Sequence, residues 1–314
     1  MVADDWAMQT PHENLTMIHT IFQSSVNSLK LLHRGKVHEV YEINGQFLLI
    51  VATDRLPVFE MVLPTPVPDK GKVLTELSRF WFGRLEHILP NHLTGMPPEI
   101  MVAPREYAQI WRRAVVVKKL VPLPVKAVVR GYLVGAGWKE YRKHHSVCGI
   151  PLTAGLLEAD KLFPPLLTLS RKAKEGSHHD ENIGFAVAEE LLGKELATQI
   201  RGISNALYTE ASTYAQSRGI VIVEASFEFG LDERGELHLI GEVLTPDSAS
   251  FCALDQYRPG HAAPSFDKQH VHDWLKYRGW NKRFPGPELP PDVVAKTIEK
   301  YRELLIRLTD RIGG

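Results

Sequence analysis

With 314 residues, 44% of them hydrophobic, the chain can bury a sizeable core as one large two-lobed domain or two smaller ones. Its 37 Lys and Arg residues balance its 37 Asp and Glu residues, so no basic field favours a nucleic-acid partner and no acidic excess favours disorder. We therefore expect a small-molecule partner.

Cysteine usage and apolar patterning both indicate a soluble, cytoplasmic protein. Cys148 and Cys252 could pair only once, and two thiols in a chain of this length are typical of cytosolic usage, so both are expected to be reduced. The N-terminus lacks a cationic start followed by an apolar run, and no window approaches the roughly 18 apolar residues needed to span a bilayer. Neither a membrane nor a nucleic acid is an expected partner.

Short apolar runs predict buried strands at 46–53, 114–119 and 125–129. The prolines of the LVPLP segment separate the last two runs. A break of this kind can leave backbone groups free to face a ligand in a connector between lobes, and an ordinary proline turn explains it equally well.

Helical periodicity predicts three long helices. The range 75–88 carries an apolar stripe typical of a core face, 194–218 repeats apolar residues until Gly219 ends the helix, and 291–311 begins with proline in its first turn. The ranges 220–230 and 236–244 read as a hairpin, because Asp232 and Gly235 favour a turn between them.

The hairpin carries candidate acids. Glu224 and Glu228 share one face of the first strand, and Glu242 on the second could oppose them in a metal or acid-base cluster. Magnesium prefers such hard oxygen ligands, and usually takes few carboxylates beside waters and phosphate oxygens. A solvated row of acids is the alternative.

Basic glycine loops are candidates for phosphate binding. Gly35 allows a close backbone approach to an anion and Lys36 supplies an ammonium, while Lys70 and its neighbours form a second basic glycine stretch. Such loops are also common as solvated turns. His38 follows the first loop and could titrate near neutral pH.

Substrate-binding candidates come next along the chain. Arg130 ends an apolar strand beside a glycine-rich bend, where its guanidinium could grip a carboxylate or phosphate, or cap the strand in an ion pair. Asp180 and Glu181 could orient a polar substrate, and a helix N-terminus would favour acids there equally well.

Segments across nearly the whole chain resemble the SAICAR synthetase (phosphoribosylaminoimidazole-succinocarboxamide synthase) family. They are RGKV within 34–72, VVRGYLVGAGWKEY at 128–141, HDENI at 179–183, FEFGLDERGEL at 227–237, EVLTPDS at 242–248 and SFDKQ at 265–269. The resemblance implies a two-lobed α+β fold with a nucleotide cleft between the lobes. A β-rich phosphate-loop lobe would span 1–120 and an α+β substrate lobe 121–314, unless the two form one integrated domain.

The family uses Mg-ATP to activate a carboxylate of an aminoimidazole ribonucleotide and joins it to aspartate. Its motifs, combined with the patterns above, give the candidate site residues. These are Glu224, Glu228, Glu242 and Asp247 as catalytic, Gly35, Lys36, Lys70 and Lys118 as nucleotide-binding, Arg130, Asp180 and Glu181 as substrate-binding, and Glu228 and Glu242 as metal ligands.

Several charged positions depart from the family pattern. KVRDVY reads KVHEVY, SAFD reads PVFE, the acid before CVVRGYL is Lys126, and GYLTGSGW has Val134 and Ala136 in place of hydroxyl residues. In the hairpin, DTKFEFG has Ser226 in place of lysine, and IDEVLTPDSSRFW has Gly241 in place of aspartate and Ser250 in place of arginine. A glycine cannot replace a metal-binding carboxylate, and lost cations remove charge that would stabilise phosphate.

These departures favour a diverged paralogue that acts on an aminoimidazole or purine ribonucleotide in specialised purine-nucleoside biosynthesis, of the pentostatin or coformycin type. One alternative is an ATP-dependent SAICAR synthetase whose lost groups are replaced from elsewhere in the chain. Another is a non-catalytic nucleotide-binding or scaffold protein. The sequence leaves open whether ATP and magnesium are used, and a homo-oligomer is compatible with it.

Overall fold

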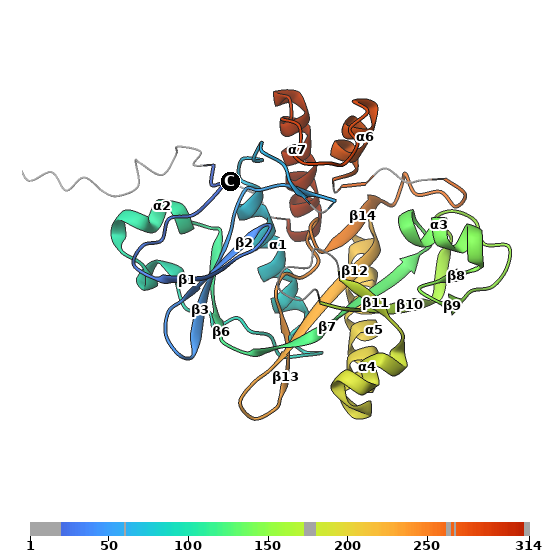
Figure 1. The fold of residues 1–314 in the computed structure, drawn as a ribbon, viewed down its shortest axis with the longest axis horizontal. Coiled ribbons are helices and arrows are strands. Elements are labelled where there is room, and N and C mark those ends of the chain that lie inside the picture. The colour runs from blue at the N-terminus through green and yellow to red at the C-terminus, as the bar shows by residue number, and fades with distance from the viewer. Residues whose placement is uncertain (1–19, 60, 173–179, 262–264, 267, 311–314) are drawn as a thin grey trace, which may run out of the picture.

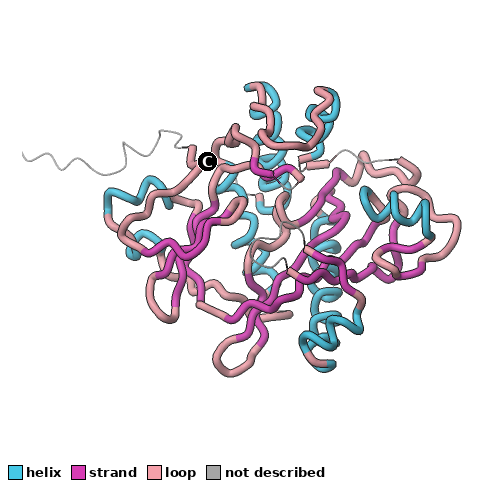
Figure 2. The backbone as a smooth tube through the Cα atoms, in the orientation of Figure 1, coloured by secondary structure: helices cyan, strands magenta, loops and turns pink. Residues whose placement is uncertain are grey.

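The computed structural model describes residues 20–59, 61–172, 180–261, 265–266 and 268–310. Its α+β architecture has two antiparallel sheets side by side, with helices packed against them (Figure 1). The predicted fold class is confirmed. The tube view separates the strands of the two sheets from the helices that lie around them (Figure 2).

The smaller sheet has the order β1-β2-β3-β6. Its strands are β1 (Lys30–Arg34), β2 (His38–Glu42), β3 (Phe47–Ala52) and β6 (Ala114–Lys118). The runs predicted at 46–53 and 114–119 are β3 and β6, which pair with each other. Their buried residues, including Leu49 and Val116, form the core of this sheet.

The larger sheet has the order β11-β10-β7-β12-β13, and β14 also pairs with β12. Its strands are β7 (Val121–Tyr132), β10 (Lys161–Arg171), β11 (Glu181–Ile183), β12 (Ile220–Leu231), β13 (Leu237–Ile240) and β14 (Ala249–Ala253). The predicted hairpin is β12 and β13, although the second strand is shorter than expected. Two-stranded ribbons are formed by β4 (Pro57–Val58) with β5 (Met61–Val62), and by β8 (Ser146–Val147) with β9 (Ile150–Pro151).

The predicted proline break is wrong. Pro122 and Pro124 lie inside β7, which begins at Val121 and continues through the predicted 125–129 run. The pairing of β7 with β12 shifts register between Glu228 and Gly230, next to these prolines. An irregular strand end accommodates residues that lack an amide hydrogen, so the prolines need no turn.

The helices are α1 (Lys70–Leu85), α2 (Tyr107–Ile110), α3 (Gly135–His144), α4 (Phe185–Leu192), α5 (Lys194–Ser217), α6 (Gln269–Tyr277) and α7 (Pro291–Thr309). Two short 3-10 helices cover Pro98–Met101 and Pro104–Glu106. The three predicted long helices are confirmed as α1, α5 and α7. None of the helices among the described residues is long and apolar enough to cross a membrane.

Helix α1 links the two sheets. Its predicted stripe is buried at Leu77, Trp81 and Leu85, in one hydrophobic cluster with residues of α5, α7, β7 and β12. The proposed boundary between 120 and 121 falls in the short connection from β6 to β7. Helix α1 precedes that boundary in sequence but packs against elements that follow it, including α5 and α7. A division into 1–120 and 121–314 therefore stays a proposal.

A pair of glycines in α1 tests this packing. A Cβ added at Gly71 would lie 2.2 Å from the carbonyl oxygen of Ala52, whereas a Cβ at Gly83 meets nothing within 4 Å. We predict that Gly71→Ala lowers the free energy of unfolding by about 2 kcal/mol or more, because the clash is with backbone. Gly83→Ala should raise it by about 0.5 to 1 kcal/mol through helix propensity. Urea unfolding followed by circular dichroism measures both, and equal effects would contradict the close approach.

Candidate active site

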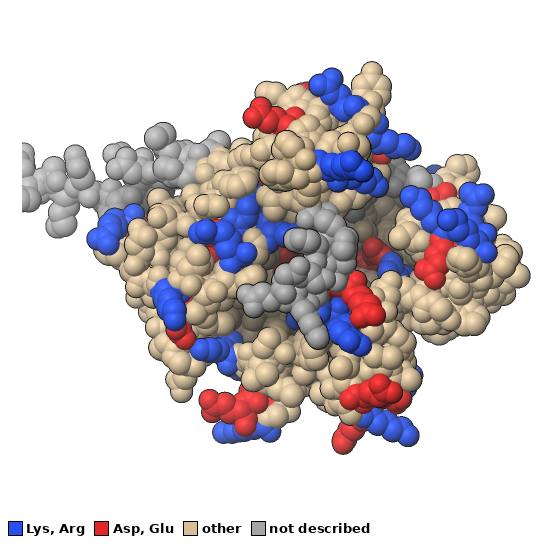
Figure 3. Space-filling model, in the orientation of Figure 1, with Lys and Arg blue, Asp and Glu red and all other residues tan. Residues whose placement is uncertain are grey.

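A cleft lies between the smaller sheet and the larger one. A cavity of about 420 Å³ is lined by β7, β12 and the segment from Pro246 to Ser250, and a second of about 280 Å³ reaches β2 and β3. The two cavities share Lys126, Ser226, Asp247 and Ser248 in their walls. In Figure 3, Lys and Arg side chains and Asp and Glu side chains lie near one another towards the middle of this face.

The acids of β12 face this cleft. Glu224 and Glu228 lie on one face, while Phe227 and Phe229 are fully buried on the other, as strand alternation requires. Glu224 forms an ion pair with Arg130 of the neighbouring strand β7. Glu228 accepts a hydrogen bond from Lys172 Nζ at 2.6 Å. Arg130 therefore both lines the larger cavity and forms the ion pair that was its alternative role.

Glu228 stays ionised in this setting. Burial alone would raise the pKa of its carboxyl, but the ammonium of Lys172, then Lys126 and His38, lower that pKa below its ordinary value. A carboxylate that keeps its negative charge in a cleft can bind a metal ion or orient a cationic group.

Asp247 is the most enclosed acid of the cleft. Its carboxylate receives Lys70 Nζ at 2.5 Å, Lys268 Nζ at 2.9 Å and the Tyr301 hydroxyl at 3.0 Å. Burial raises the pKa of Asp247, but Lys268 and Lys70 outweigh it and hold that pKa well below its usual range. Burial lowers the pKa of Lys70 in turn, against the attraction of Asp247. Two ammonium groups therefore stabilise the negative charge of the Asp247 carboxylate.

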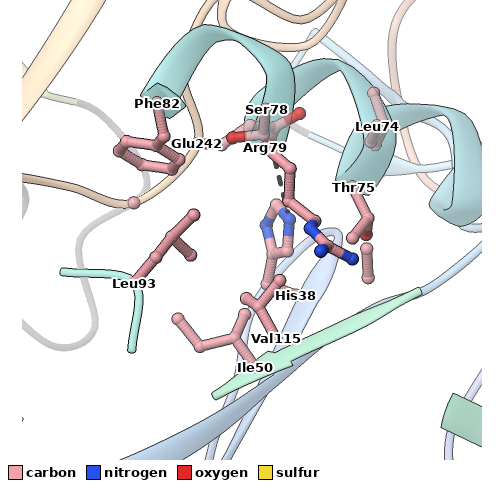
Figure 4. Close-up of a pocket in the computed structure, with 12 residues that line it drawn as sticks. His38, Ile50, Leu74, Thr75, Ser78, Arg79, Phe82, Leu93, Val115 and Glu242 are labelled. Atoms are coloured by element: carbon pink, nitrogen blue, oxygen red, sulfur yellow. Dashed lines mark ion pairs between the residues drawn. The ribbon is translucent and has the colours of Figure 1, made fainter. Parts of the chain in front are cut away.

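Glu242 lies between the second cavity and a smaller one of about 30 Å³, drawn in Figure 4. Its Oε2 is 3.7 Å from Nε2 of His38, and its other oxygen accepts a hydrogen bond from the Thr245 hydroxyl. Arg79 of α1 lines the same small cavity. Glu242 thus lies beside His38 of β2, in the wall of a cavity that Arg79 of α1 also lines.

Glu228 and Glu242 fit a magnesium ion that also binds phosphate. They line the same cavity from two segments, and two carboxylates beside waters and phosphate oxygens is the donor set that Mg²⁺ prefers. Gly241 lies between them in the wall, with φ of 75° and an added Cβ 3.8 Å from Glu228 Oε2. An aspartate there would have supplied a further carboxylate.

A different acidic group lies at the tip of the hairpin. Among the described residues, Asp232, Glu236 and His238 are the one set of three side chains spaced to hold a metal. Asp232 Oδ1 accepts hydrogen bonds from the backbone amides of Arg234 and Glu236. The turn explains this group without a metal.

Buried charged side chains fix the backbone of the first predicted phosphate loop. Arg55 donates to the carbonyl oxygens of Gly35 and Lys36 at 2.8 and 3.0 Å, and to Glu39 at 2.7 Å. Glu39 is fully buried and also accepts hydrogen bonds from Ser24 and Arg34. These contacts fix the loop backbone, while the side chain of Lys36 is exposed.

Other candidate residues lie away from the three cavities. Lys70 is fully buried against Asp247, so it links α1 to the loop that follows β13. Lys118 is exposed at the end of β6, and Asp180 and Glu181 are exposed near β11, where Glu181 lies 3.9 Å from Arg171. None of these four lines any of the three cavities, and neither do Gly35 and Lys36. Their binding roles stay predictions.

Sequence reasoning missed several cations and hydroxyls of the cleft. Lys172 and Lys268 pair with Glu228 and Asp247, and Ser248 and His272 line the larger cavity. Lys268 belongs to the quoted SFDKQ motif, which was a usable signal, whereas Asp267 of that motif lies outside the described residues. No sequence motif identified Lys172, because its partner Glu228 lies 56 residues later in the chain.

Most departures from the family pattern gather in this cleft. Lys126, Ser226 and Ser250 line the larger cavity, and His38 and Gly241 line the second. Phe59 of the PVFE segment stacks on His272 with ring centroids 4.8 Å apart, and Glu60 lies outside the described residues. The substitutions therefore bear on ligand contacts rather than on the core.

Comparisons with known proteins agree on one family. A family model described as SAICAR synthetase matches residues 31–287. The phosphoribosylaminoimidazole-succinocarboxamide synthases of Methylobacillus flagellatus and Thioalkalivibrio sulfidiphilus are each 55% identical to the chain, covering 94% and 93% of it and 99% of each relative. A solved structure, the SAICAR-synthase from Saccharomyces cerevisiae complexed with SAICAR, has a TM-score of 0.86 at 36% identity, covering 93% of this chain and 98% of that one.

The buried acid beneath the phosphate loop should make stability depend on pH. Although burial opposes it, hydrogen bonds from Ser24, Arg55 and Arg34 lower the pKa of Glu39 in the folded state. The contribution of Glu39 to the free energy of unfolding is therefore complete above the pKa of a glutamate in the unfolded chain, about 4.3. That contribution is lost as the pH falls through the lower pKa that Glu39 has in the folded state. We predict that Glu39→Gln costs about 3 kcal/mol at pH 7, and less as pH drops below about 4.

Urea unfolding at pH 7, 5 and 3.5 measures this difference. Glu299→Gln is the matched control, because Glu299 is an exposed acid on α7. Its effect should stay within about 0.5 kcal/mol at every pH. A cost for Glu39→Gln that does not change with pH would show that Glu39 contributes no charge-dependent stability.

Proposed function

The chain belongs to the SAICAR synthetase family, and we propose that it is an ATP-dependent ligase that joins aspartate to carboxyaminoimidazole ribonucleotide. The observation that carries this proposal is the 55% identity over 99% of a relative named as that synthase. The yeast neighbour is complexed with SAICAR, which supports a ribonucleotide in the cleft between the sheets. These relatives favour an ordinary SAICAR synthetase over the diverged paralogue.

The reaction requires two transfers in one cleft. The carboxylate of the ribonucleotide takes the γ-phosphoryl group of ATP, so that ADP leaves and an acyl phosphate forms. The amino group of aspartate then attacks the acyl carbon, forming the amide C–N bond as the C–O bond to phosphate breaks and the amine loses a proton. Both steps build negative charge on phosphate oxygens, which nearby cations stabilise.

The cleft residues suit these tasks. Arg130 can orient a carboxylate or phosphate with its guanidinium, and its ion pair with Glu224 fixes the direction of that group. Arg55 fixes the backbone of the loop at Gly35 and Lys36, and the exposed side chain of Lys36 would supply an ammonium for phosphate. Glu228 and Glu242 would hold magnesium, which when bound supplies charge that neutralises the phosphate oxygens.

One observation favours a second candidate function. The cavity wall at Gly241 lacks the carboxylate of the family pattern, and Ser250 in the larger cavity replaces an arginine. A paralogue with altered chemistry on an aminoimidazole or purine ribonucleotide would keep the ribonucleotide cleft and lose the ligase reaction. Product mass distinguishes the two functions in a single assay.

We predict aspartate-dependent SAICAR formation from purified protein with ATP, magnesium and carboxyaminoimidazole ribonucleotide, detected by mass spectrometry. Glu228→Gln should lower kcat by about 100-fold or more, because it removes a carboxylate that would hold the magnesium ion at the phosphate-transfer site. Glu233→Gln, at an exposed position in the turn of the same hairpin, should leave kcat unchanged. No SAICAR from the unaltered protein, with a different product from a purine ribonucleotide, would support the second candidate.

We also predict that binding depends on two cations. Lys36→Ala should weaken ATP binding and Arg130→Ala should weaken ribonucleotide binding, each roughly tenfold or more, since a charged hydrogen-bond partner contributes about 1.5 to 3 kcal/mol. Isothermal titration calorimetry with and without magnesium measures both. Arg234→Ala, in the exposed hairpin turn, is the control. Unchanged affinity in both variants would place the ligand outside this cleft.

A further inference from the structure

The wall shared by the two larger cavities carries a cation that the proposed mechanism does not use. Lys126 lies on β7, half-buried, and lines both the 420 Å³ cavity and the 280 Å³ cavity. Lys126 therefore belongs to the part of the wall that the two cavities share. A ligand extending from one cavity into the other would pass this side chain.

Lys126 differs from the other cations of these walls. Arg130 is paired with Glu224, and Lys268 with Asp247. Among the described residues, Lys126 has no ion pair within 4.0 Å. The acid opposite it on β12, Glu228, forms its ion pair with Lys172, although the charge of Lys126 also lowers the pKa of Glu228. An ammonium lining a cleft without a dedicated carboxylate is available to an anionic ligand.

The strand register places Lys126 close to position 226. Lys126 is opposite Glu228 and Val128 is opposite Ser226, so positions 126 and 226 are diagonal neighbours on the same face. Diagonal neighbours lie about 7 to 8 Å apart, within reach of a lysine side chain. The family pattern has an acid at 126 and lysine at 226, whereas this chain has lysine at 126 and serine at 226.

We propose that Lys126 supplies, from the neighbouring strand, the ammonium that this chain lacks at position 226, and that it contacts a phosphate or carboxylate of a ligand spanning the two cavities. The inference deepens the proposed function and rests on it. The exchange keeps a single ammonium on this part of the wall. Ser226 no longer supplies charge, and its hydroxyl donates to the carbonyl oxygen of Ser248 at 2.8 Å.

The first experiment compares Lys126→Gln with the unaltered protein by isothermal titration calorimetry. The probes are ADP, the aminoimidazole ribonucleotide and aspartate, each alone. Losing the ammonium should weaken at least one of them roughly tenfold or more. Weaker binding of ADP identifies a phosphate contact, and weaker binding of aspartate identifies a carboxylate contact. Weaker binding of the ribonucleotide alone identifies a contact with that ligand, through its phosphate or its carboxylate. Unchanged affinity for all three probes overturns the proposal.

A charge exchange provides the second experiment. Lys126→Glu removes the ammonium and should lower kcat/KM at least tenfold, and Ser226→Lys supplies an ammonium from the neighbouring strand. The double variant, with Glu at 126 and Lys at 226, has one ammonium again and should recover most of the lost activity. A double variant no better than Lys126→Glu alone overturns the exchange. Thermal unfolding of all variants identifies any loss that comes from misfolding.

The outcomes separate this inference from the proposed function. If the unaltered protein makes no SAICAR, the proposed ligase reaction fails, while the calorimetric comparison still tests the anion contact at Lys126. If the protein makes SAICAR and Lys126→Gln changes neither affinity nor kcat/KM, the ligase stands and the role of Lys126 is rejected.

Discussion

The buried carboxylate of Asp247 holds the cleft and the helices together. It receives Lys70 from the first turn of α1, Lys268 from the start of α6 and the Tyr301 hydroxyl from α7. Because the same residue lines both larger cavities, any movement of these helices is transmitted to the wall of the site. A charge so enclosed is costly unless every partner is present, so these elements must assemble as one unit.

A second buried charge positions the opposite side of the cleft. Glu39 and Arg55 are both almost completely buried, and Arg55 also binds the backbone of the Gly35 and Lys36 loop. Preorganised donors stabilise phosphate without paying a reorganisation cost during the reaction. The glutamate that departs from the family's KVRDVY element therefore serves to hold the loop, and its change from aspartate need not alter the chemistry.

Local patterns predicted what depends on neighbours in sequence. Helical periodicity identified α1, α5 and α7, and strand alternation placed Glu224 and Glu228 on one face of β12. It could not find the partners of these acids, because Lys70 and Asp247 are 177 residues apart and Lys172 and Glu228 are 56 apart. The prediction of a break at the prolines of β7 was wrong for a related reason. The irregular pairing that accommodates them depends on β12, which lies about 100 residues later in the chain.

Two charged groups of the family pattern are absent at positions 226 and 241, and only the first has a substitute nearby in space. The missing lysine at 226 is offset in space by Lys126, because adjacent strands present both positions to the same cavities. The missing carboxylate at 241 has no such replacement among the described acids that line the second cavity, where Asp247 is already committed to two lysines. In the proposed ligase, Glu228 and Glu242 are therefore the carboxylates that would hold a metal. The metal site, rather than the phosphate contacts, would then separate an ordinary ligase from an altered one.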